Sequence, residues 1–312
     1  MSPSDRVDLS VQVGALRLRN PILTASGTFG YGVEFAHLVD LNKLGGIVTK
    51  GISREPIDGA PSPRVCETAS GMLNAIGLQN VGVEEFIKTK LPVLQKYNTH
   101  TIVNVFGYCL EDYLEVIHRL EDHEGISAYE LNISCPNVKQ GGMQFGANPS
   151  AVTEVVEAAR KAAARRPLWV KLLPLVTDIK EIAHAAESAG ADALTIANTY
   201  PAMAIDVKTG RSKIGNPTGG LSGPAIKPLT MRLVWEAGKA VKIPILGLGG
   251  VETAEDVLEY IAVGASAVQV GTASFADPRS SERIAGRLAE ALKEVKAFTV
   301  KEIRGRFAGE NG

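Results

Sequence analysis

Cysteine is scarce in this sequence, and its scarcity bears on where the protein resides. Three cysteines occur in 312 residues, at Cys66, Cys109 and Cys135, and they are odd in number and widely spaced. Secreted domains that depend on disulfides carry a denser and even set of cysteines. We therefore expect no disulfide framework and a cytoplasmic location.

Long hydrophobic runs and an excess of one charge are also missing. Lys171 interrupts the richest apolar stretch, LWVKLLPLV, and the opening residues MSPSDRVDLS lack the apolar segment of a signal peptide. Lys plus Arg (33) nearly equal Asp plus Glu (34), so no net field favours nucleic acid or an anionic membrane. The composition predicts a protein that binds neither.

Short β-branched runs alternate with amphipathic helical patterns along most of the chain. The predicted strands are 22–25, 46–50, 101–106, 129–134, 168–173, 193–198, 243–248 and 267–271. The predicted helices are 83–97, 111–122, 149–166, 178–189, 228–240 and 254–263. Eight strands with intervening helices predict an α/β fold, a (β/α)₈ TIM barrel that spans residues 1–312 as a single domain. A doubly wound open sheet is the alternative, but no strand is followed by a nucleotide-binding fingerprint.

Capping residues support several of these helix ends. Asn148 precedes a proline at the start of one helix, and Thr253 with Asp256 resembles a capping box at the start of another. Gly190 and Gly264 occupy positions that suit helix C-termini.

Two further segments lie outside the barrel pattern. Residues 7–20 alternate in polarity and turn at Gly14-Ala15, which predicts an N-terminal β-hairpin closing the bottom of the barrel. Residues 202–223, after the sixth strand, are too long and too rich in glycine for a simple turn. Long segments of this kind in compact domains are usually functional, so we expect a functional insertion on the catalytic side.

Polar side chains and glycines follow the predicted strands. In a barrel of this kind the C-terminal strand ends surround the active site. In chain order the residues there are Ser26, Lys50, Asn104, Asn132, Cys135, Lys171, Asn198, Thr199, Gly249, Gly250, Gly271 and Thr272. They provide two lysines, several amides, one thiol and two glycine turns, but no pair of carboxylates.

The two glycine turns follow strands seven and eight, where such barrels commonly bind a phosphate. Glycines let backbone N–H groups approach a phosphate, and the following helix adds a favourable dipole. Each turn taken alone is equally well explained as an ordinary tight turn. Together they favour a ligand that carries a phosphate.

Lys50 and Lys171 end apolar strands, where a single lysine can simply extend to water. Two lysines facing one pocket would place positive charge beside an electron-rich ring or a carboxylate. Asparagine amides would complement an amide-rich ring, although each alone also fits a turn or cap. The asparagines are Asn74, Asn132, Asn137 and Asn198. The loop NAIGLQN, residues 74–80, adds backbone groups that could surround a carboxylate.

Cys135 is the candidate for chemical reactivity. A lone cysteine is usually an inert small hydrophobe, and Cys66 and Cys109 fit that description. Cys135 differs because LNISCPN ends a strand at a proline and places asparagines on both sides of the thiol. No histidine falls at a C-terminal strand end, which argues against Cys–His catalysis and a metal site. The remaining role is that of a proton acceptor.

Several motifs together resemble one known family. TASGTFGYG, VTKGIS, NAIGLQNVG, LNISCPNVKQGG, VKLLP, IANT, GLSGPAIKP, PILGLGGV and QVGTA occur in this order. They resemble the flavin-binding dihydroorotate dehydrogenases of pyrimidine (UMP) biosynthesis, from about Asn20 to Ala273. The cysteine in SCPN is similar to class 1, since class 2 uses serine and has a membrane segment. CPNVKQGG resembles class 1B more than the fumarate-using class 1A.

The resemblance implies one FMN per chain and oxidation of dihydroorotate to orotate, with Cys135 as the base at C5 and hydride passing from C6 to flavin N5. The implied FMN-binding residues are Ser26, Lys50, Gly51, Asn104, Asn132, Lys171, Ala197, Gly223, Gly249, Gly250, Gly271 and Thr272. The implied substrate-binding residues are Lys50, Asn74, Ala75, Ile76, Gly77, Leu78, Asn132, Asn137, Asn198 and Thr199.

The resemblance also implies a route for the electrons. Class 1B enzymes pass them to NAD through a subunit that carries FAD and an iron–sulfur cluster and docks on a homodimer, giving a heterotetramer. The chain agrees, because a cluster ordinarily needs four cysteines and no GxGxxG follows a strand. We expect FAD and the cluster only on the partner.

Three other functions compete with this one. The flavin domain of dihydropyrimidine dehydrogenase has a similar cysteine loop, but histidine typically replaces the residue at the position of Asn137. A fumarate-dependent class 1A enzyme would need no partner. A flavin-holding subunit without turnover would need neither Lys50 nor Cys135.

Overall fold

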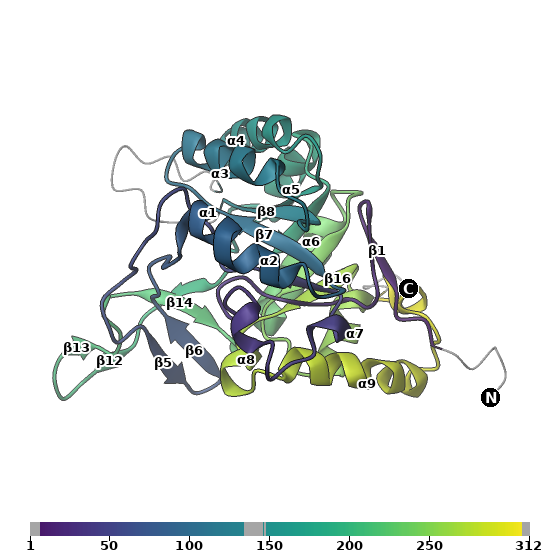
Figure 1. Ribbon diagram of the computed structural model, residues 1–312. Coiled ribbons are helices and arrows are strands. Elements are labelled where there is room, and N and C mark those ends of the chain that lie inside the picture. Colours follow the sequence, from purple (N-terminus) through teal and green to yellow (C-terminus); the bar gives the residue numbers. More distant parts are fainter. Residues whose placement is uncertain (1–6, 134–145, 147, 308–312) are drawn as a thin grey trace.

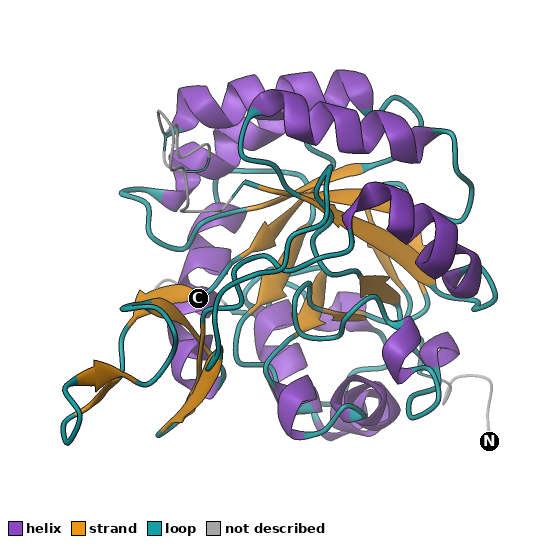
Figure 2. Cartoon of the chain, turned by 60° about the vertical axis from the view of Figure 1, so that its left-hand side comes forward, coloured by secondary structure: helices purple, strands orange, loops and turns teal. Residues whose placement is uncertain are grey.

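The structure is a computed structural model that describes residues 7–133, 146 and 148–307 (Figures 1 and 2). Cys135 and Asn137 lie outside the described residues, so their predicted roles stay predictions. The remaining predicted site residues are all described.

Eight parallel strands close into a barrel, as the sequence predicts. Their order around the barrel is β10-β15-β16-β3-β4-β7-β8-β9. The strands are β3 (Ile22–Thr24), β4 (Gly46–Val48), β7 (His100–Val105), β8 (Ala128–Asn132), β9 (Leu168–Lys171), β10 (Ala193–Ile196), β15 (Ile245–Leu248) and β16 (Ala267–Val270). Every predicted barrel strand is confirmed within two residues at either end.

Helices surround this barrel, which is visible as the central strands in Figure 2. Five match predicted helices: α3 (Leu110–Glu121), α4 (Pro149–Ala162), α5 (Ile179–Ser188), α6 (Lys227–Gly238) and α7 (Ala254–Ala262). The predicted helix 83–97 is instead α1 (Gly82–Glu85), the π-helical turn η4 (Phe86–Lys90) and α2 (Leu91–Leu94). Three helices were not predicted: α8 (Ala273–Ala276), α9 (Ser280–Glu294) and α10 (Val300–Ile303).

The predicted caps are present. The Asn148 side chain accepts a hydrogen bond from the Ala151 N–H, and Thr253 and Asp256 form a reciprocal capping box at the start of α7. Gly190 and Gly264 adopt φ angles of 99° and 113°, in the region that glycine tolerates best.

The barrel interior contains a separate apolar cluster at its N-terminal end. Its buried members are Val13, Leu18, Leu23, Val48, Ile102, Ala128, Trp169, Ala193, Leu246 and Ala267. Val13 and Leu18 belong to the hairpin of β1 (Val11–Val13) and β2 (Leu16–Leu18), so the predicted hairpin does close the bottom of the barrel. Because strand side chains alternate, the residue two positions further along each strand also points inward. Those residues lie closer to the C-terminal ends of the strands.

A second sheet stands at the other end of the barrel from the hairpin (Figure 1). It joins two distant segments in the order β11-β14-β6-β5. Its strands are β5 (Val65–Thr68), β6 (Gly71–Asn74), β11 (Tyr200–Ala202) and β14 (Gly219–Ser222), and the small hairpin of β12 (Ile205–Asp206) and β13 (Arg211–Ser212) projects beyond them. The insertion after the sixth barrel strand is confirmed, but the pairing of its strand β14 with β6 was not predicted.

Candidate active site

The C-terminal ends of the barrel strands bring most of the predicted site residues together. Asn104 on β7, Asn132 on β8 and Lys171 on β9 are buried, with exposed fractions of 0%, 9% and 4%. Ser26 and Lys50 lie two residues beyond the ends of β3 and β4 and are half-buried. Ala197 follows β10, where its N–H donates to the Leu248 carbonyl and so closes that part of the rim.

A layer of buried polar side chains separates this rim from the apolar base. Its centre is Glu130 on β8, which is 0% exposed. The Glu130 carboxylate accepts hydrogen bonds from Asn104 Nδ2 at 2.7 Å, from Thr195 Oγ1 at 2.7 Å and from Gln269 Nε2 at 2.5 Å. The sequence analysis missed Glu130, Thr195 and Gln269. A signal for them existed, because each stands two residues before a predicted site residue, namely Asn132, Ala197 and Gly271.

The side-chain oxygen of Asn104 makes no hydrogen bond within this layer. This oxygen, Oδ1, is buried and has no hydrogen-bond partner among the described residues. A Cβ built on Gly51 would lie 3.0 Å from this oxygen, so the oxygen faces the loop that follows Lys50. A buried acceptor without a donor is costly, which suits a position that a ligand N–H completes.

The two lysines provide positive charge in a poorly solvated setting. Burial lowers the pKa of Lys171 and the nearby Glu130 opposes that shift. Burial also lowers the pKa of Lys50; the positive charge of Arg64 lowers it further, and Glu34 opposes the shift. Within the described residues neither ammonium has a hydrogen-bonded or ion-paired partner. Both are therefore available to an anionic or electron-rich ligand.

The predicted phosphate turns lie beside each other. A Cβ built on Gly250 would be 2.8 Å from the Gly223 carbonyl oxygen, and one on Gly223 would be 3.5 Å from Thr272 Cγ2. Gly223 and Gly250 have φ angles of 96° and 67°, which favour glycine. The N–H groups of Gly250 and Thr272 donate no hydrogen bond to any residue that the structure describes. These segments form a cradle lined by backbone donors, as phosphate binding requires.

Lys227 lies beside this cradle but is engaged elsewhere. Its Nζ lies 2.5 Å from Asp256 Oδ1 and 2.7 Å from Glu259 Oε2. A phosphate in the cradle would therefore be held chiefly by backbone groups.

The substrate-side residues meet at the second sheet. Asn74, at the end of β6, donates from Nδ2 to the Gly220 carbonyl at 3.1 Å. A Cβ on Gly220 would collide with Thr199 Oγ1 at 2.1 Å, so β14 lies directly between Asn74 and Thr199. Asn198 Oδ1 accepts from the Thr199 N–H at 2.8 Å. Gly220 was not predicted; it permits this close approach.

The loop of residues 75–78 is held by a neighbouring segment. The Ala75 N–H donates to the Arg64 carbonyl, and the Ile76 carbonyl accepts from the Ala60 N–H. Leu78 has a positive φ of 59°. The N–H groups of Gly77 and Leu78 donate to no partner in the described part of the chain, which fits the predicted contact with a carboxylate.

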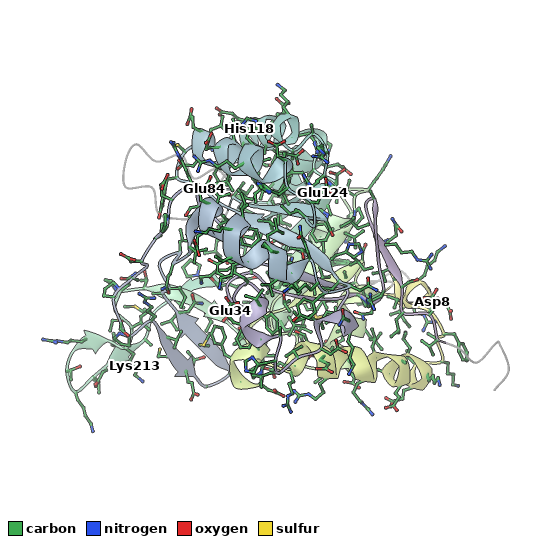
Figure 3. The ribbon with its side chains drawn as sticks, in the orientation of Figure 1. Asp8, Glu34, Glu84, His118, Glu124 and Lys213 are labelled. Atoms are coloured by element: carbon green, nitrogen blue, oxygen red, sulfur yellow. The ribbon has the colours of Figure 1, made fainter. Side chains whose placement is uncertain are left out.

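Histidines and metal ligands do not gather at these strand ends. His118 lies on the outer side of α3 (Figure 3), and His100 bonds Ser127 and the Arg17 carbonyl at the bottom of the barrel. Over residues 7–133, 146 and 148–307, no group of three His, Cys, Asp or Glu side chains could hold a metal.

None of the helices described in those residues has the length and apolar character needed to span a membrane.

The fold and the strand-end residues thus define a (β/α)₈ barrel whose C-terminal end carries two adjacent glycine turns, two poorly solvated lysines and several asparagines. Residues 8–292 match the family described as dihydroorotate dehydrogenase. The chain belongs to the dihydroorotate dehydrogenase family.

Several relatives are similar over nearly their whole length. A Trichlorobacter lovleyi protein named dihydroorotate dehydrogenase B (NAD(+)), catalytic subunit, is 52% identical over 301 residues, 96% of this chain and 99% of that one. A Geobacter metallireducens protein of the same name is 53% identical over 300 residues, covering 96% and 98%. A Solibacter usitatus protein with the provisional name dihydroorotate dehydrogenase A (fumarate) is 54% identical over 285 residues, covering 91% and 93%.

The residues present fit FMN, the cofactor that this family implies. The cradle of Gly223, Gly250 and Thr272 suits its phosphate. The unpartnered Asn104 oxygen and the Lys171 ammonium suit the polar edge of its ring. Both groups are buried at the same end of the barrel.

Replacing Gly250 by alanine should weaken FMN binding about tenfold or more, the equivalent of losing one good hydrogen bond. The added Cβ would lie 2.8 Å from both the Gly223 oxygen and Lys227 Cβ, so the cradle must shift. Titration of flavin-free protein with FMN, followed by fluorescence, measures the change.

Gly264→Ala is the matched control. Gly264 also has a positive φ, but a Cβ there meets no atom within 4 Å. This variant should lose some stability and keep its FMN affinity. A folded Gly250→Ala protein with unchanged affinity would contradict the phosphate assignment.

Proposed function

We propose that this chain oxidises dihydroorotate to orotate in pyrimidine (UMP) biosynthesis, using one FMN, in the cytoplasm. The observation that carries the proposal is the joint presence of the family match over residues 8–292 and a site with the required chemistry at the strand ends. The Lys50 ammonium and the N–H groups of Gly77 and Leu78 suit the substrate carboxylate. The amides of Asn74, Asn132, Asn137 and Asn198 suit its ring.

In this proposal the protein's own residues bind the substrate and move one proton. Cys135 would remove the proton at C5, since no histidine or carboxylate pair is available at the described strand ends. Lys50 and Asn198 would fix the ring so that C5 faces the thiol. Bound FMN would supply the two-electron acceptor for the oxidation.

We further propose that the electrons reach NAD through a partner subunit that carries FAD and an iron–sulfur cluster, arranged as a heterotetramer around a homodimer of this chain. The names of the Trichlorobacter and Geobacter relatives support this acceptor. The chain itself has three cysteines. A cluster ordinarily needs four cysteine ligands, so this chain has too few to hold one by itself.

Replacing Cys135 by alanine should slow reduction of the bound flavin by dihydroorotate about 10²–10⁴-fold, the usual contribution of a positioned base. A free thiol has a pKa of about 8.5, so the rate in the unaltered protein should rise as pH approaches that value. Anaerobic stopped-flow absorbance measures both effects. Cys109→Ala, at an exposed site, is the control and should behave normally. An undiminished rate in Cys135→Ala would refute the assignment.

The lowered pKa of Lys50 gives orotate binding a pH dependence. The protonated form attracts the carboxylate, so affinity should fall as pH rises through a value below the ordinary lysine pKa of about 10.4. Lys50→Gln should bind orotate about 10–150-fold more weakly at neutral pH, as expected for a lost hydrogen bond to a charged group worth about 1.5–3 kcal/mol. It should also lose this alkaline decline.

Titration of the flavin absorbance with orotate across pH measures this effect. Lys213→Gln, at an exposed position just after β13 of the projecting hairpin (Figure 3), should retain the pH profile of the unaltered protein. An alkaline decline that persists unchanged in Lys50→Gln would assign the titration to another group.

The electron acceptor can be tested on the FMN-loaded chain alone, without oxygen. With dihydroorotate it should reduce an artificial dye, yet reduce NAD only at background rates until the partner subunit is added. Efficient NAD reduction by the lone chain would overturn the partner proposal. Efficient fumarate reduction would place the protein with the fumarate-dependent enzymes, which is the alternative that the Solibacter relative supports.

A further inference from the structure

Glu130 organises the polar layer of the barrel although it is buried beneath the rim. It is 0% exposed, and side chains from β7, β10 and β16 all donate to its carboxylate. Lys171, on the neighbouring strand β9, adds the opposing charge.

The geometry of these hydrogen bonds determines how two amides are oriented. A carboxylate accepts hydrogen bonds and cannot donate them, so each amide must turn its NH₂ group toward Glu130. Asn104 and Gln269 both do so, and the oxygens of both amides are buried without a partner in the described residues. For Asn104 the oxygen is turned toward Gly51, beside Lys50 and the predicted flavin site.

We propose that Glu130 is a positioning residue: it holds Asn104 so that the side-chain oxygen, and not the NH₂ group, faces the flavin. The pocket then presents an acceptor that selects an N–H group of the ring. This inference rests on the proposed use of FMN. It adds a residue that touches neither cofactor nor substrate yet determines which polar atom the ligand meets.

Glutamine at position 130 would reverse this selection. Its oxygen could accept from Thr195 and Gln269, while its NH₂ group could donate to Asn104. All of these bonds are satisfied by a single change, a flip of the Asn104 amide. In the alternative placement, the glutamine NH₂ group would face Thr195 and Gln269 and its oxygen would face Asn104. That placement requires the Gln269 amide to flip and the Thr195 hydroxyl to rotate, so that both can accept a hydrogen bond. Glu130→Gln should therefore preserve packing and present an NH₂ group to the flavin.

A double-mutant cycle on FMN affinity tests this coupling. Glu130→Gln and Asn104→Ala should each weaken FMN binding about tenfold, and the double variant should be no weaker than Asn104→Ala alone. Thr195→Val is the control, because it removes one bond to Glu130 Oε2 and leaves the bond between Oε1 and Asn104 intact. Its FMN affinity should stay within about twofold of the unaltered chain. Additive losses in the double variant would overturn the inference, since they would mean that Glu130 acts independently of Asn104.

Neutron diffraction from the unaltered FMN-loaded protein tests the same point without any variant. The Asn104 deuterium atoms should lie on the Glu130 side, and deuterium atoms on the flavin side would overturn the inference. Failure of the unaltered chain to bind FMN would overturn the proposed cofactor and this inference together. FMN binding that is indifferent to Glu130→Gln would overturn the inference alone.

Discussion

The alternation of side chains along eight closed parallel strands is the constraint on which the site depends. Inward-facing residues fall into layers, and here the layers differ in polarity. The base is apolar and is sealed by Val13 and Leu18 of the N-terminal hairpin. The next layer holds Glu130 and its donors, and the rim above it holds Lys50, Asn132 and the glycine turns. The N-terminal part of the strands therefore supplies apolar residues that pack in the barrel base, and the C-terminal part supplies polar residues.

Burying charge in the middle layer requires compensation. An isolated carboxylate or ammonium in such a setting would be strongly disfavoured. Three donated hydrogen bonds and the nearby Lys171 supply compensation for Glu130. The arrangement leaves donors facing inward and selected acceptors unpaired. A rigid, pre-oriented polar surface of this kind favours one ligand arrangement over others.

The second sheet brings together residues from two distant segments of the chain. Asn74 comes from a segment early in the chain and Thr199 from the end of the sixth barrel strand. Gly220 allows the two to approach, because any side chain at that position would collide with Thr199. The sheet also leads into Gly223 and so connects Asn74 and Thr199 to the glycine turns.

Local patterns in the sequence were sufficient to predict the barrel strands, the caps of α4 and α7, and the residues at the strand ends. The pairing of β6 with β14 was not predictable in this way, because it joins residues about 150 apart and depends on tertiary contacts. α9 was missed although its sequence is amphipathic. Glu130 was also readable, as a lone acid in a buried strand two residues before Asn132. The hydrogen bonds to Glu130 could not be read from the sequence, because they form only when β7, β10 and β16 meet β8 in the folded barrel.

The central claim is that the strand ends of this barrel hold FMN and the substrate in one defined arrangement. A crystal structure of the chain with FMN and orotate tests it most directly. The account predicts the FMN phosphate against Gly223, Gly250 and Thr272, the flavin ring over Lys171 and Asn104, and the orotate carboxylate beside Lys50. Finding FMN bound outside the barrel mouth, or orotate without contact to Lys50 and the loop of residues 75–78, would contradict it.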